Sequence, residues 1–175
     1  WTDKGILKVE RTAGGHRRIA VPEALRFVRE SGLKPVLPHR LGLGDLAEVG
    51  MPADGRSRFA ELLLSGRTGD ACRLLVSAFV SGEDVATIGD SWIRPALERL
   101  GELWKHGPEG IALEHQAIDG VLRAIAEMRA LIPVDPSAPR AIGGAIGGDP
   151  YLVPSALAAL VLSAHGYQAT NFGAD

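Results

Sequence analysis

The chain has 175 residues, of which 46% are hydrophobic and 23% are charged, a composition typical of globular domains and unlike that of disordered or fibrous chains. No run of about 20 apolar residues is present, so no membrane-spanning helix is predicted, and the absence of a signal-peptide pattern predicts a cytoplasmic protein. The single cysteine, Cys72, excludes an internal disulfide and a thiolate metal cluster.

Charge is distributed unevenly along the chain. Residues 1–40 carry nine Lys and Arg against four Asp and Glu, a net charge of +5, whereas residues 41–175 carry ten against seventeen, a net charge of −7. A basic N-terminal segment on an acidic body indicates either a surface that binds an anion, most often nucleic acid, or a solvated basic face.

The first 40 residues have the pattern of a β-hairpin followed by a helix. The predicted elements are the end of a helix over residues 1–5, strands over 6–11 and 16–20, and a helix over 22–30. Pro22 is expected to begin this helix and Gly32 to end it. Gly and Pro are frequent in the residues that follow, and we assign residues 41–56 to a linker.

Residues 57–132 are predicted to form a four-helix bundle. Apolar residues recur there at three- and four-residue steps, the spacing of one face of a helix. The predicted helices cover residues 58–66, 70–82, 84–104 and 111–132. Their short connections favour antiparallel neighbours. Pro95 lies inside the third helix, where it is expected to introduce a kink.

Residues 139–175 have a strand–helix–strand order. Strands are predicted over residues 140–146 and 167–175, and a helix over 151–166. This order is typical of the start of a parallel α/β sheet. Two strands and one helix are too few to close a core, so we expect the chain to be cut at its C-terminal end, as it is expected to be cut before Trp1.

The stretch RTAGGHRR, residues 11–18, places a permissive glycine turn directly before a cluster of cations. The turn lets the hairpin tip approach a phosphate backbone, where His16, Arg17 and Arg18 can meet anionic oxygens. Residues 1–19 resemble the recognition-helix end and wing of MerR-like and excisionase-like winged helix-turn-helix proteins, which share the pattern R-T-x-G-G-H-R-R. The resemblance implies contacts to double-stranded DNA from Lys4, Lys8, Arg11, Thr12, His16, Arg17 and Arg18. The alternative is a basic hairpin on an enzyme surface.

A second motif lies in LWKHGPEGIALEH, residues 103–115. Trp104 is followed by Glu114 and His115, a spacing that resembles the W-x9-E-H motif in the helical cap of CarH-type (LitR-type) cobalamin-dependent regulators. The resemblance implies that the indole covers the upper face of cobalamin, such as adenosylcobalamin, while Glu114 and His115 contact its sugar or base. In photoreceptor members a histidine directly follows the tryptophan, and here that residue is Lys105. Taken alone, these residue types are more often core and surface residues.

A third motif, GGDPYLVPSA, corresponds to the loop after the first strand of a cobalamin-binding domain, which usually reads G-D-x-H-x-x-G. Gly148 and Asp149 match this pattern. Tyr151 replaces the histidine that binds cobalt from below, and Pro154 replaces the second glycine. A phenolate is a poor ligand unless its pKa is strongly lowered. We therefore expect weaker cobalamin binding than in a family member that has the histidine.

Together these motifs resemble the CarH/LitR group along nearly the whole chain. The implied fold class is multidomain, α and α/β: a partial winged helix-turn-helix (1–40), a four-helix cap (57–132) and the start of a Rossmann-like (flavodoxin-like) domain (139–175). The implied function is that of a bacterial transcription regulator without catalytic activity or a metal-ligating residue set, which self-associates as a dimer or tetramer. Two alternatives stay open: a corrinoid carrier module of a methyltransferase, and a sensor that has lost cobalamin binding.

Overall fold

The structure, a computed structural model, describes residues 1–32, 54–103, 108–149 and 151–174. In chain order its elements are β1 (Glu10–Arg11), β2 (Arg17–Arg18), α1 (Val21–Ser31), α2 (Gly55–Leu64), α3 (Thr68–Val80), α4 (Val85–Thr87), η3 (Ile88–Ile93), α5 (Arg94–Leu103), α6 (Pro108–Ala130), β3 (Arg140–Gly143), α7 (Leu152–Ala164) and β4 (Gln168–Asn171). The chain is thus of mixed α and β class, with most described residues in helices and two small sheets. No described helix is long and apolar enough to cross a membrane.

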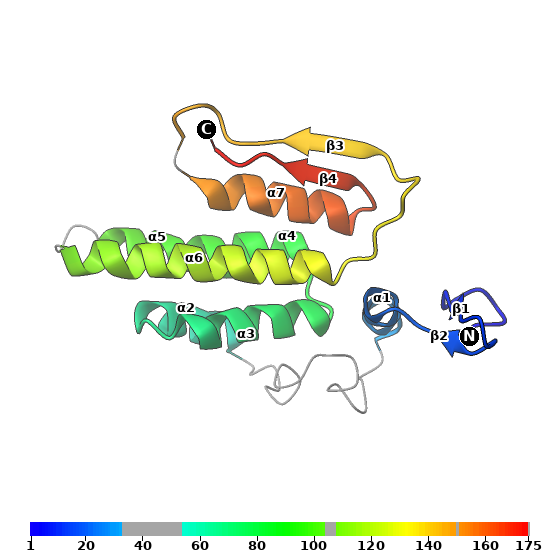
Figure 1. Cartoon of the computed structure of the whole chain (residues 1–175). Coiled ribbons are helices and arrows are strands. Elements are labelled where there is room, and N and C mark those ends of the chain that lie inside the picture. The colour runs from blue at the N-terminus through cyan, green and yellow to red at the C-terminus, as the bar shows by residue number, and fades with distance from the viewer. Residues whose placement is uncertain (33–53, 104–107, 150, 175) are drawn as a thin grey trace.

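These elements stack in layers (Figure 1). The β3–β4 sheet lies on α7, α7 lies on the layer that contains α4, α5 and α6, and α2 and α3 form the layer beyond. Helix α1 and the β1–β2 hairpin lie at one end of this stack. The predicted linker over residues 41–56 lies outside the described residues except for its end, where α2 already begins at Gly55.

The N-terminal hairpin forms at the predicted place, but its strands are shorter than predicted. Glu10 pairs with Arg18 and Arg11 with Arg17, in antiparallel register. Residues 6–9 were expected in the first strand and are not part of it, because the residues that would pair with them, 19–22, lead into α1, which begins at Val21. Residues 1–6 instead form a Schellman motif, the hydrogen-bond pattern that ends helices. The N–H of Ile6 donates to the Trp1 carbonyl, and Gly5 has a left-handed φ of 69°.

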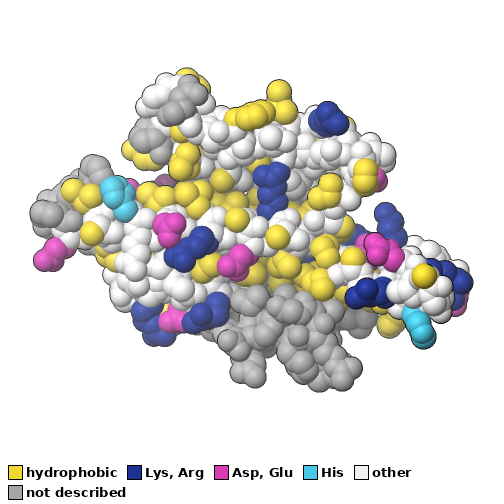
Figure 2. All heavy atoms as spheres, viewed as in Figure 1, with side chains coloured by type: hydrophobic (Ala, Val, Ile, Leu, Met, Phe, Trp, Pro, Cys, Tyr) yellow, Lys and Arg dark blue, Asp and Glu magenta, His cyan; other side chains and the backbone are white. Residues whose placement is uncertain are grey.

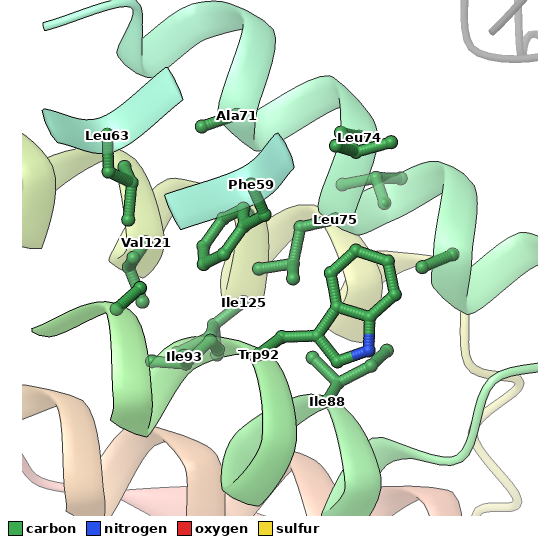
Figure 3. Close-up of a cluster of buried hydrophobic side chains, with 14 of the residues drawn as sticks. Phe59, Leu63, Ala71, Leu74, Leu75, Ile88, Trp92, Ile93, Val121 and Ile125 are labelled. Atoms are coloured by element: carbon green, nitrogen blue, oxygen red, sulfur yellow. The ribbon is translucent and has the colours of Figure 1, made fainter. Parts of the chain in front are cut away.

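One continuous core joins the bundle to α7. Figure 3 shows the rings of Phe59 and Trp92 pointing into the same cluster as Leu75. These two rings meet edge to face, with centroids 6.2 Å apart. Val153 and Leu160 of α7 belong to the same buried cluster. Helix α7 therefore packs on the bundle as part of its core.

The third predicted helix, residues 84–104, is not a single kinked helix. The chain begins with the short α4, passes through the π-helical turn η3 and continues as α5. Within η3 the backbone bonds span five residues, as in the bond from Arg94 N–H to the Gly89 carbonyl. Pro95 has no N–H for the Ser91 carbonyl, so the wider turn accommodates the proline at the point where a kink was predicted.

The C-terminal segment forms the predicted strand–helix–strand unit. Strands β3 and β4 are parallel, with Ala141 opposite Ala169, and the chain reaches β4 through α7. Arg129 at the end of α6 donates a hydrogen bond to the Ala169 carbonyl, which ties the bundle to this sheet. Helix α7 begins at Leu152, and Pro154 lies in its first turn, where a missing N–H costs no helical hydrogen bond.

Helices α3 and α6 approach most closely at Gly120. A Cβ built on Gly120 would lie 1.9 Å from Cγ2 of Thr68, the buried residue that begins α3. We expect Gly120→Ala to destabilise the protein by about 1–3 kcal/mol through overpacking, although alanine is the better helix former. The double variant Gly120→Ala/Thr68→Ser should recover most of this loss, because serine lacks the methyl group.

Gly101 provides the matched control, since a Cβ at that helical position would meet no atom within 4 Å. Gly101→Ala should raise the free energy of unfolding by up to about 1 kcal/mol. Urea denaturation of the three variants measures these changes. A Gly120→Ala variant as stable as wild type would contradict the close approach of α3 to α6.

Candidate functional site

The seven residues predicted to contact DNA lie on the hairpin and on the turn that precedes it. All of their side chains are exposed except Thr12, which is half-buried. Figure 2 shows Lys and Arg side chains gathered at this end of the molecule. The structure therefore places the predicted cations at one end of the molecule, with Arg11 and Arg17 on one face of the hairpin and Arg18 on the other, since Arg11 lies opposite Arg17 and Arg18 opposite Glu10.

The tip of the hairpin is fixed by Thr12 and the glycine turn. The Thr12 N–H donates to the His16 carbonyl over 2.9 Å, and the Thr12 hydroxyl accepts from the His16 N–H over 3.2 Å. Gly15 has a φ of 80°, which other residues adopt only with strain. The glycine is thus required for the turn that places His16 next to the strand arginines.

The arginines of the hairpin differ in their surroundings. The Arg17 guanidinium donates to the Thr2 hydroxyl and to the Asp3 carboxylate, both over 2.9 Å. Within the described residues, Arg11 and Arg18 form no ion pair. Neither of these two side chains is engaged by a described carboxylate, although Arg18 lies opposite Glu10 in the hairpin, whereas Arg17 is already paired on the surface.

A buried carboxylate holds the hairpin against α1. Glu23 is only 7% exposed, and its side chain accepts from the Lys8 N–H over 2.7 Å and from the Arg26 guanidinium over 2.6 Å. Arg26 also donates to the Ile6 carbonyl, over 2.9 Å. The hydrogen bond from Arg26 holds the pKa of Glu23 below its ordinary value, against the opposing effect of burial. Sequence reasoning missed this residue, because a glutamate in a first helical turn usually faces water.

Helix α1 in turn contacts the bundle through Arg29. Its guanidinium lies over the Phe79 ring of α3, 3.9 Å from the centroid, and donates to the Glu83 carbonyl over 3.3 Å. Burial lowers the pKa of Arg29. Hairpin, α1 and bundle are therefore connected by specific contacts.

A cavity of about 750 Å³ lies between the bundle and α7. One wall comes from α4, η3 and α5, a second from α6, and a third from the start of α7. Most of its lining is aliphatic; it includes Val85, Ile93, Leu97, Ile118, Leu157 and Val161. This size is within the usual range for small-molecule sites.

Four charged side chains also line this cavity. Arg94 and Glu98 pair with each other, Nε to Oε1, over 3.3 Å, and both are largely exposed. Asp90 and Glu114 form no ion pair with any described residue. Since Asp90 belongs to η3 and Glu114 to α6, unpaired carboxylates stand on two different walls.

The residues predicted to hold a cofactor are only partly brought together. Glu114 and Tyr151 line the cavity, whereas His115 is exposed and is not among its lining residues. His115 therefore does not line this cavity, and its expected contact with a cofactor stays a prediction. Trp104, whose indole was expected to cover the upper face of cobalamin, lies outside the described residues.

Asp149 has a structural role in the loop that precedes α7. Its carboxylate accepts from the Tyr151 N–H over 2.9 Å, which shapes the entry into the helix. The Tyr151 side chain is 65% exposed and reaches the cavity mouth. Asp149 thus orders the backbone at the position where the resembling family has its ligand histidine.

The described residues do not fit a cobalamin held from below by a protein histidine. No described histidine lines the cavity, and no described group of three or more His, Cys, Asp or Glu is placed to hold a metal ion. No protein-family model matches the chain, and no curated protein matches it. The hairpin and the cavity are therefore the features of this chain that bear on its function.

Three parallel rows on the segment from α4 to α5 carry a signal that sequence reasoning missed. The buried row consists of Ile88, Trp92, Ala96 and Leu100. The row that lines the cavity consists of Gly89, Ile93, Leu97 and Gly101, and the charged row at its rim consists of Asp90, Arg94 and Glu98. Each row repeats at four-residue steps, and the middle row has small residues at both ends. A helix with two apolar rows beside each other contacts two partners.

Proposed function

We propose that the chain belongs to a DNA-binding transcription regulator in which the β1–β2 hairpin contacts the phosphate backbone. The observation that carries this proposal is the exposed, unpaired pair Arg11 and Arg18 beside a glycine turn, on a hairpin that Glu23 locks to α1. Cations on a hairpin that is held in place lose less conformational entropy on binding than cations on a flexible loop. Phosphate contacts of this kind position a protein on DNA without reading its sequence.

The cavity supports a sensor role for the rest of the chain. It lies where bundle and α7 meet, so an occupant would contact both parts and favour the arrangement in which they are packed together. Contacts from Glu23 and Arg29 connect the bundle to the hairpin. We propose self-association as a dimer or tetramer, because one hairpin provides few phosphate contacts.

Tyr151 favours a second version of this function, in which the sensor has lost cobalamin. Tyr151 lines the cavity but is mostly exposed, and the Asp149 carboxylate accepts from the Tyr151 N–H, an arrangement that favours a structural role for both residues over cobalt ligation. A regulator of this type would respond to another occupant of the same cavity.

DNA binding is tested by titrating a fluorescent duplex of about 30 base pairs, roughly three helical turns, with the purified protein at about 50 mM salt. We expect a saturable rise in anisotropy that is reversed by added salt, because counterion release drives phosphate contacts. The same duplex with an excess of unlabelled DNA of unrelated sequence measures how much of the affinity is non-specific. No rise in anisotropy at low salt would contradict the proposed function.

A further inference from the structure

We propose that the cavity between α5, α6 and α7 binds an apolar organic cation of small-molecule size. The inference rests on the sensor role proposed above for the same cavity and names the class of ligand that it takes. Three observations carry it: the volume, the aliphatic lining and the sign of the unpaired charges.

The lining selects an apolar body. Ile93 of η3, Leu97 of α5 and Leu157 of α7 line the cavity of about 750 Å³. Removing apolar surface from water on such walls is favourable in proportion to the area buried. A strongly hydrated ligand such as a sugar or a free nucleotide would find few polar partners there.

The charges select a cation. Glu98 pairs with Arg94 at the rim, and among the described residues of the lining the remaining charged groups are the carboxylates of Asp90 and Glu114. Glu114 is half-buried and makes no described ion pair, so its charge is incompletely solvated. An anion would be repelled by both carboxylates, and a neutral ligand would bury Glu114 further without a partner. A cation offsets both effects, and the Tyr151 ring at the mouth adds a cation–π surface.

The test uses two probes of almost the same shape and opposite charge, tetraphenylphosphonium and tetraphenylborate. Isothermal titration calorimetry of the purified protein without DNA should show saturable binding of the cation and at least about tenfold weaker binding of the anion. Equal or tighter binding of tetraphenylborate, or no binding of tetraphenylphosphonium, would overturn the proposal. Tight binding of hydroxocobalamin that excludes the cation would also overturn it, in favour of a corrinoid.

Two variants locate the binding. Gly101→Phe directs a ring into the cavity from a position where a Cβ meets nothing within 4 Å, so the variant should fold and lose the cation. Glu114→Gln should weaken the cation about tenfold while leaving the weak binding of the anion unchanged or stronger. The matched control is Glu127→Gln, an exposed position of the same helix α6 outside the cavity, which should bind as wild type does.

The failure of this proposal is distinguishable from failure of the proposed function. DNA binding is measured in the absence of either probe, and cation binding is measured in the absence of DNA. Cation binding that survives Gly101→Phe would place the cation elsewhere on the protein and overturn the assignment of the cavity, whatever the result with DNA.

Discussion

Trp92→Ala is expected to lower the free energy of unfolding by about 3–5 kcal/mol, the usual cost of removing a buried aromatic ring. The indole is 3% exposed and packs against the Phe59 ring at the centre of the core cluster. The backbone around it is the π-helical turn η3, so the cavity left by alanine borders an already irregular helix. Urea denaturation with the midpoint and slope fitted separately measures the loss.

The variant Trp92→Phe separates the loss of the indole N–H from the loss of the aromatic ring. The indole Nε1 is buried and has no hydrogen-bond partner among the described residues, a state that costs about 1–3 kcal/mol. Phenylalanine removes this unpaired donor and keeps most of the ring. We therefore expect the phenylalanine variant to be at least about 2 kcal/mol more stable than the alanine variant. Equal losses in the two variants would mean that the indole N–H is satisfied after all.

Glu23→Ala is expected to release the hairpin from α1, at a cost of about 1–3 kcal/mol to the hairpin, the usual cost of removing one partner of a part-buried hydrogen bond that involves a charged group. The variant leaves the Lys8 N–H without its acceptor and removes a pair with Arg26. Hydrogen exchange at the Lys8 amide should become faster, and DNA affinity should fall because the hairpin is no longer held. Glu30→Ala removes an exposed partner of the same arginine and should cost under about 1 kcal/mol.

The same carboxylate makes the hairpin sensitive to acid. The pKa of Glu23 lies below its ordinary value of 4.5 in the folded state. Its contribution is therefore complete above pH 4.5 and is lost as the pH falls through the lowered pKa. Exchange at Lys8 should accelerate in this acid range in the wild type, and this acid-dependent step should be absent from Glu23→Ala. The same pH dependence of exchange at the Lys8 amide in both proteins would contradict the role of Glu23 in holding the hairpin against α1.

Local sequence patterns account for most of the secondary structure. Gly5, Gly15 and Gly32 all adopt the left-handed φ that their positions in turns and helix ends predicted. The four-residue steps of the bundle and the strand–helix–strand order at the C-terminal end also appear as predicted. These features depend on backbone preferences and on periodicity, which a sequence displays directly.

Features that depend on tertiary contact were not predicted. The π turn accommodates Pro95, and from the sequence this proline predicted only a kink, because a kink and a wider turn both relieve the missing N–H. Burial of Glu23 depends on the Lys8 amide fifteen residues earlier in the chain. The cavity is formed by residues of α5, α6 and α7 together, so the unpaired carboxylates in its lining could not be predicted from any one of these segments.

The salt dependence of DNA binding measures directly whether the β1–β2 hairpin contacts phosphate groups. Arg11→Ala/Arg18→Ala removes the two unpaired arginines of the hairpin, and Arg73→Ala/Arg123→Ala removes the same charge from exposed positions of α3 and α6. Each phosphate contact contributes about 0.9 to the slope of log K against log salt. We expect a slope smaller by about 2 for the hairpin variant and an unchanged slope for the bundle variant. A folded hairpin variant with the wild-type slope would contradict the claim that this hairpin contacts DNA.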